Sequence, residues 1–329
     1  MIETTKPARP SRRSRPESAL PAFRPFQLAT LADKVPSGPD WLFEMKFDGY
    51  RCEAAISGGQ VRLYSRQGHD WTKQFGYVAP ALAKLTKGTL LIDGEICAFD
   101  DYGRSDFSLL KNSLDGHTPI RFMAFDLLEQ DGELVWRLPQ VERKNRLEAL
   151  LGPPDPSSPV QYSHHVEGHG KEVLAAMCEG GFEGVVAKRT NAIYHFRDRS
   201  PNWIKVKCVQ RQEFIVIGWR PPAYGPDDVR ALFLATYENG QLVYRGSVGS
   251  GVSEKDRREL LAALSTIRVE RLPVKGLPRA EARVIRWVQP LLLAEVAFTE
   301  ITPDGLVRHP SFKGIRLDKE PHDVHLEEP

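Results

Sequence analysis

The chain has 329 residues, of which 41% are hydrophobic and 27% charged, as in an ordinary soluble globular protein of about two domains. Its 45 lysines and arginines nearly balance 43 aspartates and glutamates, so the formal net charge is only +2. No apolar run reaches the ~18–20 residues of a membrane span, and no apolar stretch follows the basic N-terminus as in a secretory signal. The cysteines form no Cys-x-x-Cys pair, which argues against a zinc site or a disulfide framework and predicts a cytoplasmic protein with reduced thiols: Cys52, Cys97, Cys178 and Cys208.

Residues 1–22 differ in composition from the rest of the chain. They carry five basic groups against two acidic ones, with much Pro and Ser and almost no large apolar side chain. Such a segment cannot bury enough surface to fold, so we predict a disordered basic arm. Two interpretations stay open, a solvated tail without function and an arm that contacts phosphates.

From residue 23 to about residue 210, short apolar runs alternate with Asp-Gly pairs, which are strong turn signals. The pattern predicts strands over 41–47, 51–56, 61–64, 89–99 and 120–128. Helices are fewer and are predicted over 141–151 and 171–179, the second ending at a Gly-Gly pair. Antiparallel sheets with helices packed on them make this an α+β domain.

After about residue 210 the composition changes. Strands are predicted over 214–219, 231–237, 242–248 and 291–299. One helix is predicted over 254–264, with Ser253 as N-cap and Asp256 three residues later. Short strands with one helix fit a small barrel such as an OB-fold. We therefore predict three parts: an arm over 1–22, an α+β domain over 23–210 and an OB-fold over 211–329.

One predicted strand delivers a lysine to a sharp turn. Residues 44–51 have the sequence EMKFDGYR, which would present the amine of Lys46 at the end of a sheet. A lysine is a nucleophile only when neutral, which requires burial or nearby cations that lower its pKa. Taken alone, the segment is more typical of a solvated hairpin lysine.

Two further segments place charges on strands. Glu183 opens an apolar strand and offers oxygen ligands to a divalent cation, although a solvated charge is the commoner meaning. Lys205 and Lys207 share one strand face, and because neighbouring ammonium groups repel, we expect an anion against them. The window 187–211 holds seven basic residues and one acid, a local polyanion site that the net charge conceals. Acids elsewhere offset it, including four in the last ten residues: Glu320, Asp323, Glu327 and Glu328.

In this order, the segments resemble those of the covalent nucleotidyltransferases: ATP-dependent DNA ligases, RNA ligases and mRNA capping enzymes. The Lys-x-Asp-Gly-x-Arg run from Lys46 to Arg51 is similar to their adenylation motif. Matching segments follow as SRQG at 65–68, DGE at 93–95, FMAFD at 122–126, EGVV at 183–186, KVK at 205–207 and RLDK at 316–319. The sequences of these segments are most similar to those of bacterial ATP-dependent DNA ligases of the end-joining type.

The resemblance implies a nucleotidyltransferase (adenylation) domain followed by an OB-fold, with a cleft between them and a hinge over 207–213. It implies an ATP-dependent DNA ligase that seals nicks or breaks in duplex DNA during repair, using ATP and Mg²⁺ or Mn²⁺. Lys46 would form lysyl-AMP, the AMP would pass to the DNA 5′-phosphate, and the 3′-hydroxyl would displace it. A monomer in the cytoplasm at the nucleoid is expected, with a DNA-end-binding protein such as Ku as a partner.

The resemblance also implies roles around the nucleotide. Glu44 would accept from the adenine amino group, and Phe125 would stack on the base. The ribose side would be held by Arg51 and Glu95. Lys205 and Lys207 would bind the α-phosphate and help keep Lys46 neutral, while Glu183 would hold the metal.

Three residues of the last motif and one of the second complete these implied roles. Arg316, Asp318 and Lys319 on the OB-fold would orient pyrophosphate, and Arg66 would bind the 5′-phosphate of the nick. Purely structural alternatives stay open: Phe125 as a core residue, Glu95 as a turn residue and Arg66 as a surface charge.

Other interpretations compete with the enzyme. An RNA ligase or capping-type nucleotidyltransferase is the nearest, and a non-catalytic single-strand-binding OB module is the most different. The histidines at 164, 165 and 169 lie in a Gly-rich stretch that we expect to be a loop without a ligand role.

Overall fold

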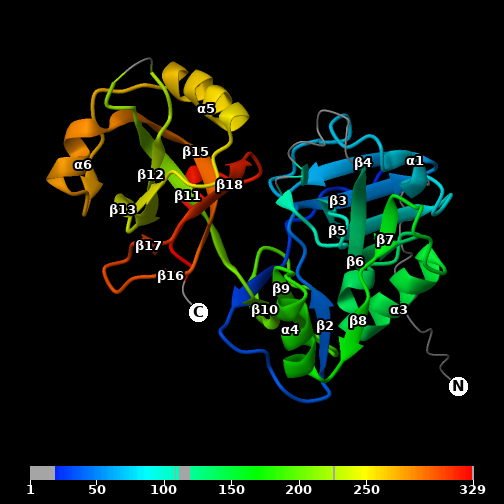
Figure 1. Cartoon of the computed structure of the whole chain (residues 1–329). Helices are drawn as coiled ribbons and strands as arrows, with labels where there is room; N and C mark the ends of the chain where they lie inside the picture. The colour runs from blue at the N-terminus through cyan, green and yellow to red at the C-terminus, as the bar shows by residue number, and fades with distance from the viewer. Residues whose placement is uncertain (1–18, 108, 111–118, 225–226, 328–329) are drawn as a thin grey trace, which may run out of the picture.

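The computed structural model describes residues 19–107, 109–110, 119–224 and 227–327. Most of the predicted arm, residues 1–18, therefore lies outside the described part. Two domains follow each other along the chain, and strand β11 (Gln210–Arg220) leads from the first into the second (Figure 1). In the described segments no helix is long and apolar enough to cross a membrane.

The first domain is built on two five-stranded sheets. One has the order β1-β10-β9-β2-β8, namely Leu28–Leu31, Arg199–Lys207, Gly184–Arg189, Trp41–Met45 and His165–Glu167. The other has the order β4-β3-β5-β6-β7, namely Gln60–Ser65, Tyr50–Ser57, Thr89–Ala98, Ile120–Gln130 and Val160–Tyr162. The predicted antiparallel sheets are in fact mixed, because β1 pairs with β10 and β6 with β7 in parallel.

Helices pack against both sheets. Helix α3 (Gln140–Leu151) packs on β6 and β7, and α4 (Gly170–Glu179) packs on β9. Among the described residues, two short helices are α1 (Ala79–Leu82) and η1 (Val135–Arg137). The predicted α+β fold is confirmed, and the strands expected from the apolar runs are present. The histidine stretch expected to be a loop instead contributes β8, a short edge strand that pairs with β2.

The second domain is a six-stranded sheet of order β14-β13-β12-β11-β15-β18. Beside β11 these are Val274–Lys275, Gln241–Val248, Ala231–Glu238, Arg286–Phe298 and Ser311–Arg316. Smaller elements are the hairpin β16 (Glu300–Ile301) and β17 (Val307–Arg308), helix α6 (Arg279–Val284) and η2 (Pro321–Asp323). This architecture is OB-like, as predicted.

Helix α5 (Glu254–Thr266) begins where the sequence predicts. Ser253 and Asp256 form a reciprocal capping box, so two backbone N–H groups at the helix start are satisfied. Leu260 and Leu264 turn inward and join the apolar core of the second domain.

The expectation that all four cysteines are reduced is wrong. Cys178 at the end of α4 and Cys208 just after β10 form a disulfide, with their Cα atoms 5.1 Å apart. Thirty residues separate them in sequence, and only the packing of α4 beside β9 and β10 brings them together. The other two cysteines, Cys52 and Cys97, are buried free thiols, so reduced thiols are correct only for this pair.

Candidate active site

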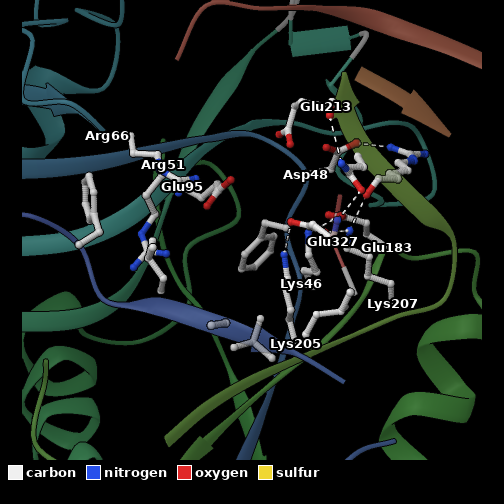
Figure 2. A pocket seen from close by; sticks show the side chains of 18 of the residues that line it. Lys46, Asp48, Arg51, Arg66, Glu95, Glu183, Lys205, Lys207, Glu213 and Glu327 are labelled. Carbon is white, nitrogen blue, oxygen red and sulfur yellow. Dashed lines mark hydrogen bonds and ion pairs between the residues drawn. The ribbon is translucent and has the colours of Figure 1, made fainter. Parts of the chain in front are cut away.

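A cavity of about 690 Å³ is lined by both domains (Figure 2). Every residue that the sequence analysis assigns to the site contributes to its wall: Glu44, Lys46, Arg51, Arg66, Glu95, Phe125, Glu183, Lys205, Lys207, Arg316, Asp318 and Lys319. These residues come from seven separate sequence segments. The cavity has two ends with different chemistry, which we name by their surroundings.

The hinge end consists of Lys46, Glu183, Lys205, Lys207 and Glu327. Lys46 follows β2 directly, and its backbone N–H donates to the carbonyl of residue 184 at 2.9 Å. Its Nζ forms an ion pair with Glu183. Burial alone would lower the pKa of Lys46, but the Glu183 carboxylate outweighs it and the pKa is raised. The other oxygen of Glu183, Oε2, is buried and has no hydrogen-bond partner.

Close backbone packing requires a glycine at position 49, where the turn after Lys46 ends. A Cβ atom there would lie 2.2 Å from the carbonyl oxygen of Ile96, closer than any side chain tolerates. The close approach lets β3 begin immediately after the turn and pair with β5. The Asp-Gly pair therefore sets where Lys46 leaves the sheet.

Lys205 and Lys207 face the cavity from β10, while Val206 between them is buried. The shared face predicted from their alternation is confirmed, and the anion that lies against it is a carboxylate of this chain. Lys205 Nζ donates to Glu327 Oε1 at 2.8 Å, and Lys207 Nζ donates to Glu327 Oε2 at 2.7 Å. Burial, with the neighbouring Lys207 and Lys46, lowers the pKa of Lys205 to about 8 although Glu327 opposes the change.

The buried end consists of Glu44, Lys144, Lys188, Phe125 and Trp203. Glu44 Oε1 lies 2.9 Å from Lys188 Nζ and 3.2 Å from Lys144 Nζ. Burial would raise the pKa of Glu44, but the two ammonium groups outweigh it and the pKa is lowered. Burial in turn lowers the pKa of Lys144 to about 8. Glu44 is thus held as a carboxylate within the protein interior.

Aromatic rings complete the buried end. Phe125 and Trp203 pack edge to face, with centroids 6.2 Å apart. Lys188 Nζ lies 4.5 Å from the Phe125 centroid and 4.3 Å from that of Trp203. Arg51 stands 4.6 Å from the Phe125 centroid and donates twice to Asp93, each bond 2.6 Å long. The ring of Phe125 therefore lies close to two cationic groups, those of Arg51 and Lys188.

A polar network behind these rings is wholly buried. Arg143 on α3 forms a bidentate pair with Asp126, through Nε at 2.7 Å and Nη2 at 2.9 Å. Gln140 donates to Asp126 at 3.0 Å and accepts from Trp203 Nε1 at 3.0 Å. The network ties α3, β6 and β10 together, so the rings of Phe125 and Trp203 are held in fixed positions.

Comparison with known proteins identifies the family. The model for the ATP dependent DNA ligase domain matches residues 26–207, and that for the ATP dependent DNA ligase C terminal region matches residues 226–319. The chain belongs to the ATP-dependent DNA ligase family. An ATP-dependent enzyme needs an ATP site, and the cavity described above lies between the two matched regions.

Individual relatives agree with this assignment. The multifunctional non-homologous end joining protein LigD of Pseudomonas aeruginosa is 36% identical over 334 residues, covering 99% of this chain and 39% of that protein. The corresponding DNA repair protein LigD of Mycobacterium tuberculosis is 34% identical over 286 residues, with 86% and 37% covered. The structure of mycobacterial DNA ligase D complexed with ATP and MES has a TM-score of 0.70 at 32% identity, covering 93% of this chain and 98% of that one. The chain spans roughly two fifths of the length of the curated relatives.

In this member of the ligase family the second domain touches the adenylation motif directly. Arg316 donates from Nη2 to the carbonyl of Gly49 at 3.1 Å, and Asp318 accepts from its Nε at 2.8 Å. Arg211 on β11 pairs with Asp48 of the motif. These contacts hold the second domain against the turn that carries Lys46.

Two assigned residues line the cavity without a direct partner. Within the described residues, the side chains of Arg66 and Glu95 make no hydrogen bond or ion pair, and burial raises the pKa of Glu95 to about 7. Unpaired polar groups on a cavity wall are available to a ligand.

The sequence analysis gave no role to four residues that form ion pairs with the assigned ones: Lys144, Lys188, Asp93 and Glu327. Lys144 had a signal, because it stands three residues before Leu147 on the apolar face of its helix, where a charge needs a buried partner. Lys188 was counted in the basic window but given no role. Glu327 had no local signal, because only the tertiary structure brings it to the lysines of β10.

Proposed function

We propose that this protein is an ATP-dependent DNA ligase that seals nicks or breaks in duplex DNA during end-joining repair. One observation carries the proposal. Lys46, the first residue of the adenylation motif, lines a cavity together with Glu183, Lys205 and Lys207. The family assignment supports the same reaction. We further propose that the adenylation domain spans 23–210 and the OB-fold 211–329.

In the first step Lys46 Nζ attacks the α-phosphorus of ATP. A P–N bond forms, the P–O bond to pyrophosphate breaks, and the proton of the attacking ammonium must leave. Glu183, already paired with Lys46 Nζ, is placed to take that proton. Lys205 and Lys207 neutralise the charge that grows on the phosphate oxygens, and such preorganised charge is the main source of catalysis in phosphoryl transfer.

The buried end is suited to the base. Glu44, held as a carboxylate, is an acceptor for the adenine amino group, and Phe125 offers a ring for stacking. Arg51 and Glu95 lie on the cavity wall where the ribose would follow. Arg66, with no protein partner among the described residues, is free to bind the 5′-phosphate of DNA.

A divalent cation fits one atom of the site. The buried Oε2 of Glu183 has no partner, and Mg²⁺ characteristically binds one or two carboxylate oxygens together with substrate phosphates. We propose that Glu183 contributes this ligand to Mg²⁺ or Mn²⁺, which would supply charge neutralisation at the phosphates. Among the described residues no cluster of three or more acidic, histidine or cysteine side chains forms a metal site by itself.

The later steps need the second domain to move. Arg316, Asp318 and Lys319 would orient pyrophosphate in the closed arrangement, and rotation about the hinge at 207–213 would then expose the lysyl-AMP to DNA. The DNA 5′-phosphate accepts the AMP, and the 3′-hydroxyl displaces it to seal the strand. We propose that the protein acts as a monomer at the nucleoid and that an end-binding protein such as Ku delivers its substrate.

Mass spectrometry tests the first step. Incubation with ATP and Mg²⁺ or Mn²⁺ should add the mass of one AMP, and Lys46→Ala should abolish the gain while the exposed-lysine variant Lys34→Ala keeps it. No gain with any divalent metal would overturn the proposed enzyme. A panel of nicked DNA, nicked RNA and mixed duplexes then identifies the substrate, and sealing of RNA without DNA would replace the DNA ligase with an RNA ligase.

A further inference from the structure

Residues 324–327 run from the second domain into the cavity and are held there by hydrogen bonds. The carbonyl of Val324 accepts from Tyr237 N at 2.9 Å, which attaches the segment to the end of β12. Gln212 on β11 clamps the next residues with both ends of its amide. It donates to the carbonyl of His325 at 2.8 Å and accepts from the N–H of Glu327 at 3.0 Å. The 324–327 segment is therefore part of the second domain.

This attachment directs the Glu327 side chain onto the first domain. Each of its carboxylate oxygens takes one ammonium group, Lys205 at 2.8 Å and Lys207 at 2.7 Å. Burial would raise the pKa of Glu327, but the two lysines outweigh it and lower the pKa to about 2. Figure 2 shows Glu327 in the same part of the cavity as Lys46 and both lysines.

A carboxylate that spans two ammonium groups makes the contact that a phosphate group would make. The proposed function assigns both lysines to the α-phosphate of ATP. A phosphate group seated against both ammonium groups would come close to the Glu327 carboxylate, and two anions at one such site repel each other. Glu327 and the α-phosphate are therefore alternatives.

We propose that the 324–327 segment is an autoinhibitory plug, in which Glu327 occupies the phosphate subsite until the nucleotide displaces it. This inference rests on the proposed function of the cavity. The plug is coupled to domain closure because its attachment points, Gln212 and Tyr237, belong to the second domain, whereas its lysine partners belong to the first. Opening about the hinge withdraws Glu327, and closure without nucleotide restores it.

The plug stabilises the closed enzyme when no nucleotide is bound. A closed enzyme without ATP would otherwise leave two adjacent ammonium groups and no counter-ion, an arrangement that repulsion disfavours. Glu327 stabilises that closed form at the cost of ATP affinity. A ligand whose binding-competent state is only partly populated binds with an affinity reduced by that fraction.

Single-turnover adenylation of the full chain, measured against ATP concentration, tests the plug. Glu327→Gln keeps the shape and removes the charge, so the half-maximal ATP concentration should fall about tenfold while the maximal rate is unchanged, as expected if about nine molecules in ten are plugged. Glu320→Gln is the matched control, because Glu320 is exposed and outside the cavity wall, and it should behave as the wild type.

Hydrogen exchange gives a readout that does not depend on turnover. A non-hydrolysable ATP analogue should speed exchange of the Glu327 amide, which donates to Gln212, because displacement breaks that bond. An unchanged half-maximal ATP concentration in Glu327→Gln, or unchanged exchange with bound analogue, overturns the plug. A lower maximal rate in Glu327→Gln also overturns it, since Glu327 would then position the lysines for catalysis. Failure of wild type and variant alike to become adenylated overturns the proposed function instead.

Discussion

The two ends of the cavity differ in which domain supplies the partner that neutralises a buried charge. At the buried end, Glu44 is neutralised by Lys144 and Lys188, all from the first domain and all nearly inaccessible to solvent. At the hinge end, Lys205 and Lys207 are neutralised by Glu327 from the second domain. The first set of charges is complete before any domain contact is made, whereas the second depends on closure.

These two kinds of ion pair suit two different tasks, recognition of a base and transfer of a phosphoryl group. A pocket that must distinguish one base needs fixed donors and acceptors, and internal ion pairs provide them without help from the rest of the chain. A site that must admit phosphate, release pyrophosphate and then receive DNA needs partners that can leave. Ion pairs across a hinge meet that need because domain movement breaks them.

Breaking the network behind the buried end should have the largest effect. Asp126→Ala leaves the Arg143 guanidinium without its buried carboxylate, and loss of one partner of such a pair destabilises a protein by about 3–5 kcal/mol. Urea unfolding measures the change. Glu142→Ala, which removes a partly exposed pair from the same helix, should cost less than about 1 kcal/mol. Equal losses in the two variants would contradict a rigid buried end.

At the hinge end the corresponding change should affect chemistry and leave the fold intact. Lys205→Ala removes a charge from the proposed α-phosphate subsite, and loss of one preorganised donor lowers rates about 10²–10³-fold. Adenylation should fall by that factor while the urea midpoint stays within error, and the exposed-lysine variant Lys73→Ala should retain full activity. Loss of DNA binding with normal adenylation would move Lys205 out of the nucleotide site.

The domain contact itself should have a smaller effect. Arg211→Ala removes the pair between β11 and Asp48 of the adenylation motif, a charge-assisted hydrogen bond. Adenylation should slow about tenfold, the effect of losing one such bond. Sealing of a pre-adenylated nick, which needs the open arrangement, should be unchanged. Arg271→Ala on the surface of the second domain serves as control, and equal slowing of both steps would argue against a closure contact.

The last effect is visible only as a dependence on pH, and it concerns a buried acid that has no lysine partner. Within the part of the chain that the structure describes, the Glu53 carboxylate accepts only from the N–H of Arg24, and burial raises its pKa to about 9, in contrast to Glu44. Between about pH 4.5 and pH 9 the unfolded chain releases this proton and the folded chain keeps it, so the free energy of unfolding falls as pH rises.

Glu53→Gln removes this dependence. The difference in unfolding free energy between variant and wild type should therefore move in favour of the variant across the same pH range, as followed by thermal or urea unfolding. The exposed-site variant Glu142→Gln should run parallel to the wild type. A pH-independent difference for Glu53→Gln would show that Glu53 ionises normally in the fold.

Local patterns in the sequence predicted most elements because their signals are local. Strand β5 begins with an apolar run, α5 has its Ser253 cap, and the alternation around Val206 places two lysines on one face. Short edge strands such as β8 were missed because three residues carry too little periodicity. The Cys178–Cys208 disulfide was missed because cysteine spacing does not reveal which helix end packs beside which strand.

The candidate site divides in the same way. The motif residues lie around one cavity as their order suggested, but their partners could not be inferred. Glu183 holds Lys46 as an ammonium group in this structure, whereas the sequence suggested that neighbouring lysines would keep it neutral. Arg51, expected beside the ribose, has its guanidinium bound by Asp93. Both differences concern pairs of charges whose distance is set by the sheets.

The sequence by itself determined which chemical groups the protein possesses: a lysine before an Asp-Gly turn, two lysines on one strand face, and a family of nucleotide-binding motifs in order. It determined these because propensity, alternation and motif spacing act over a few residues. Only the tertiary structure decided how each charge is compensated. A near-zero net charge is a sum over the chain, whereas a pKa and an ion pair depend on distance, and Glu327 reaches Lys205 only because two domains close on each other.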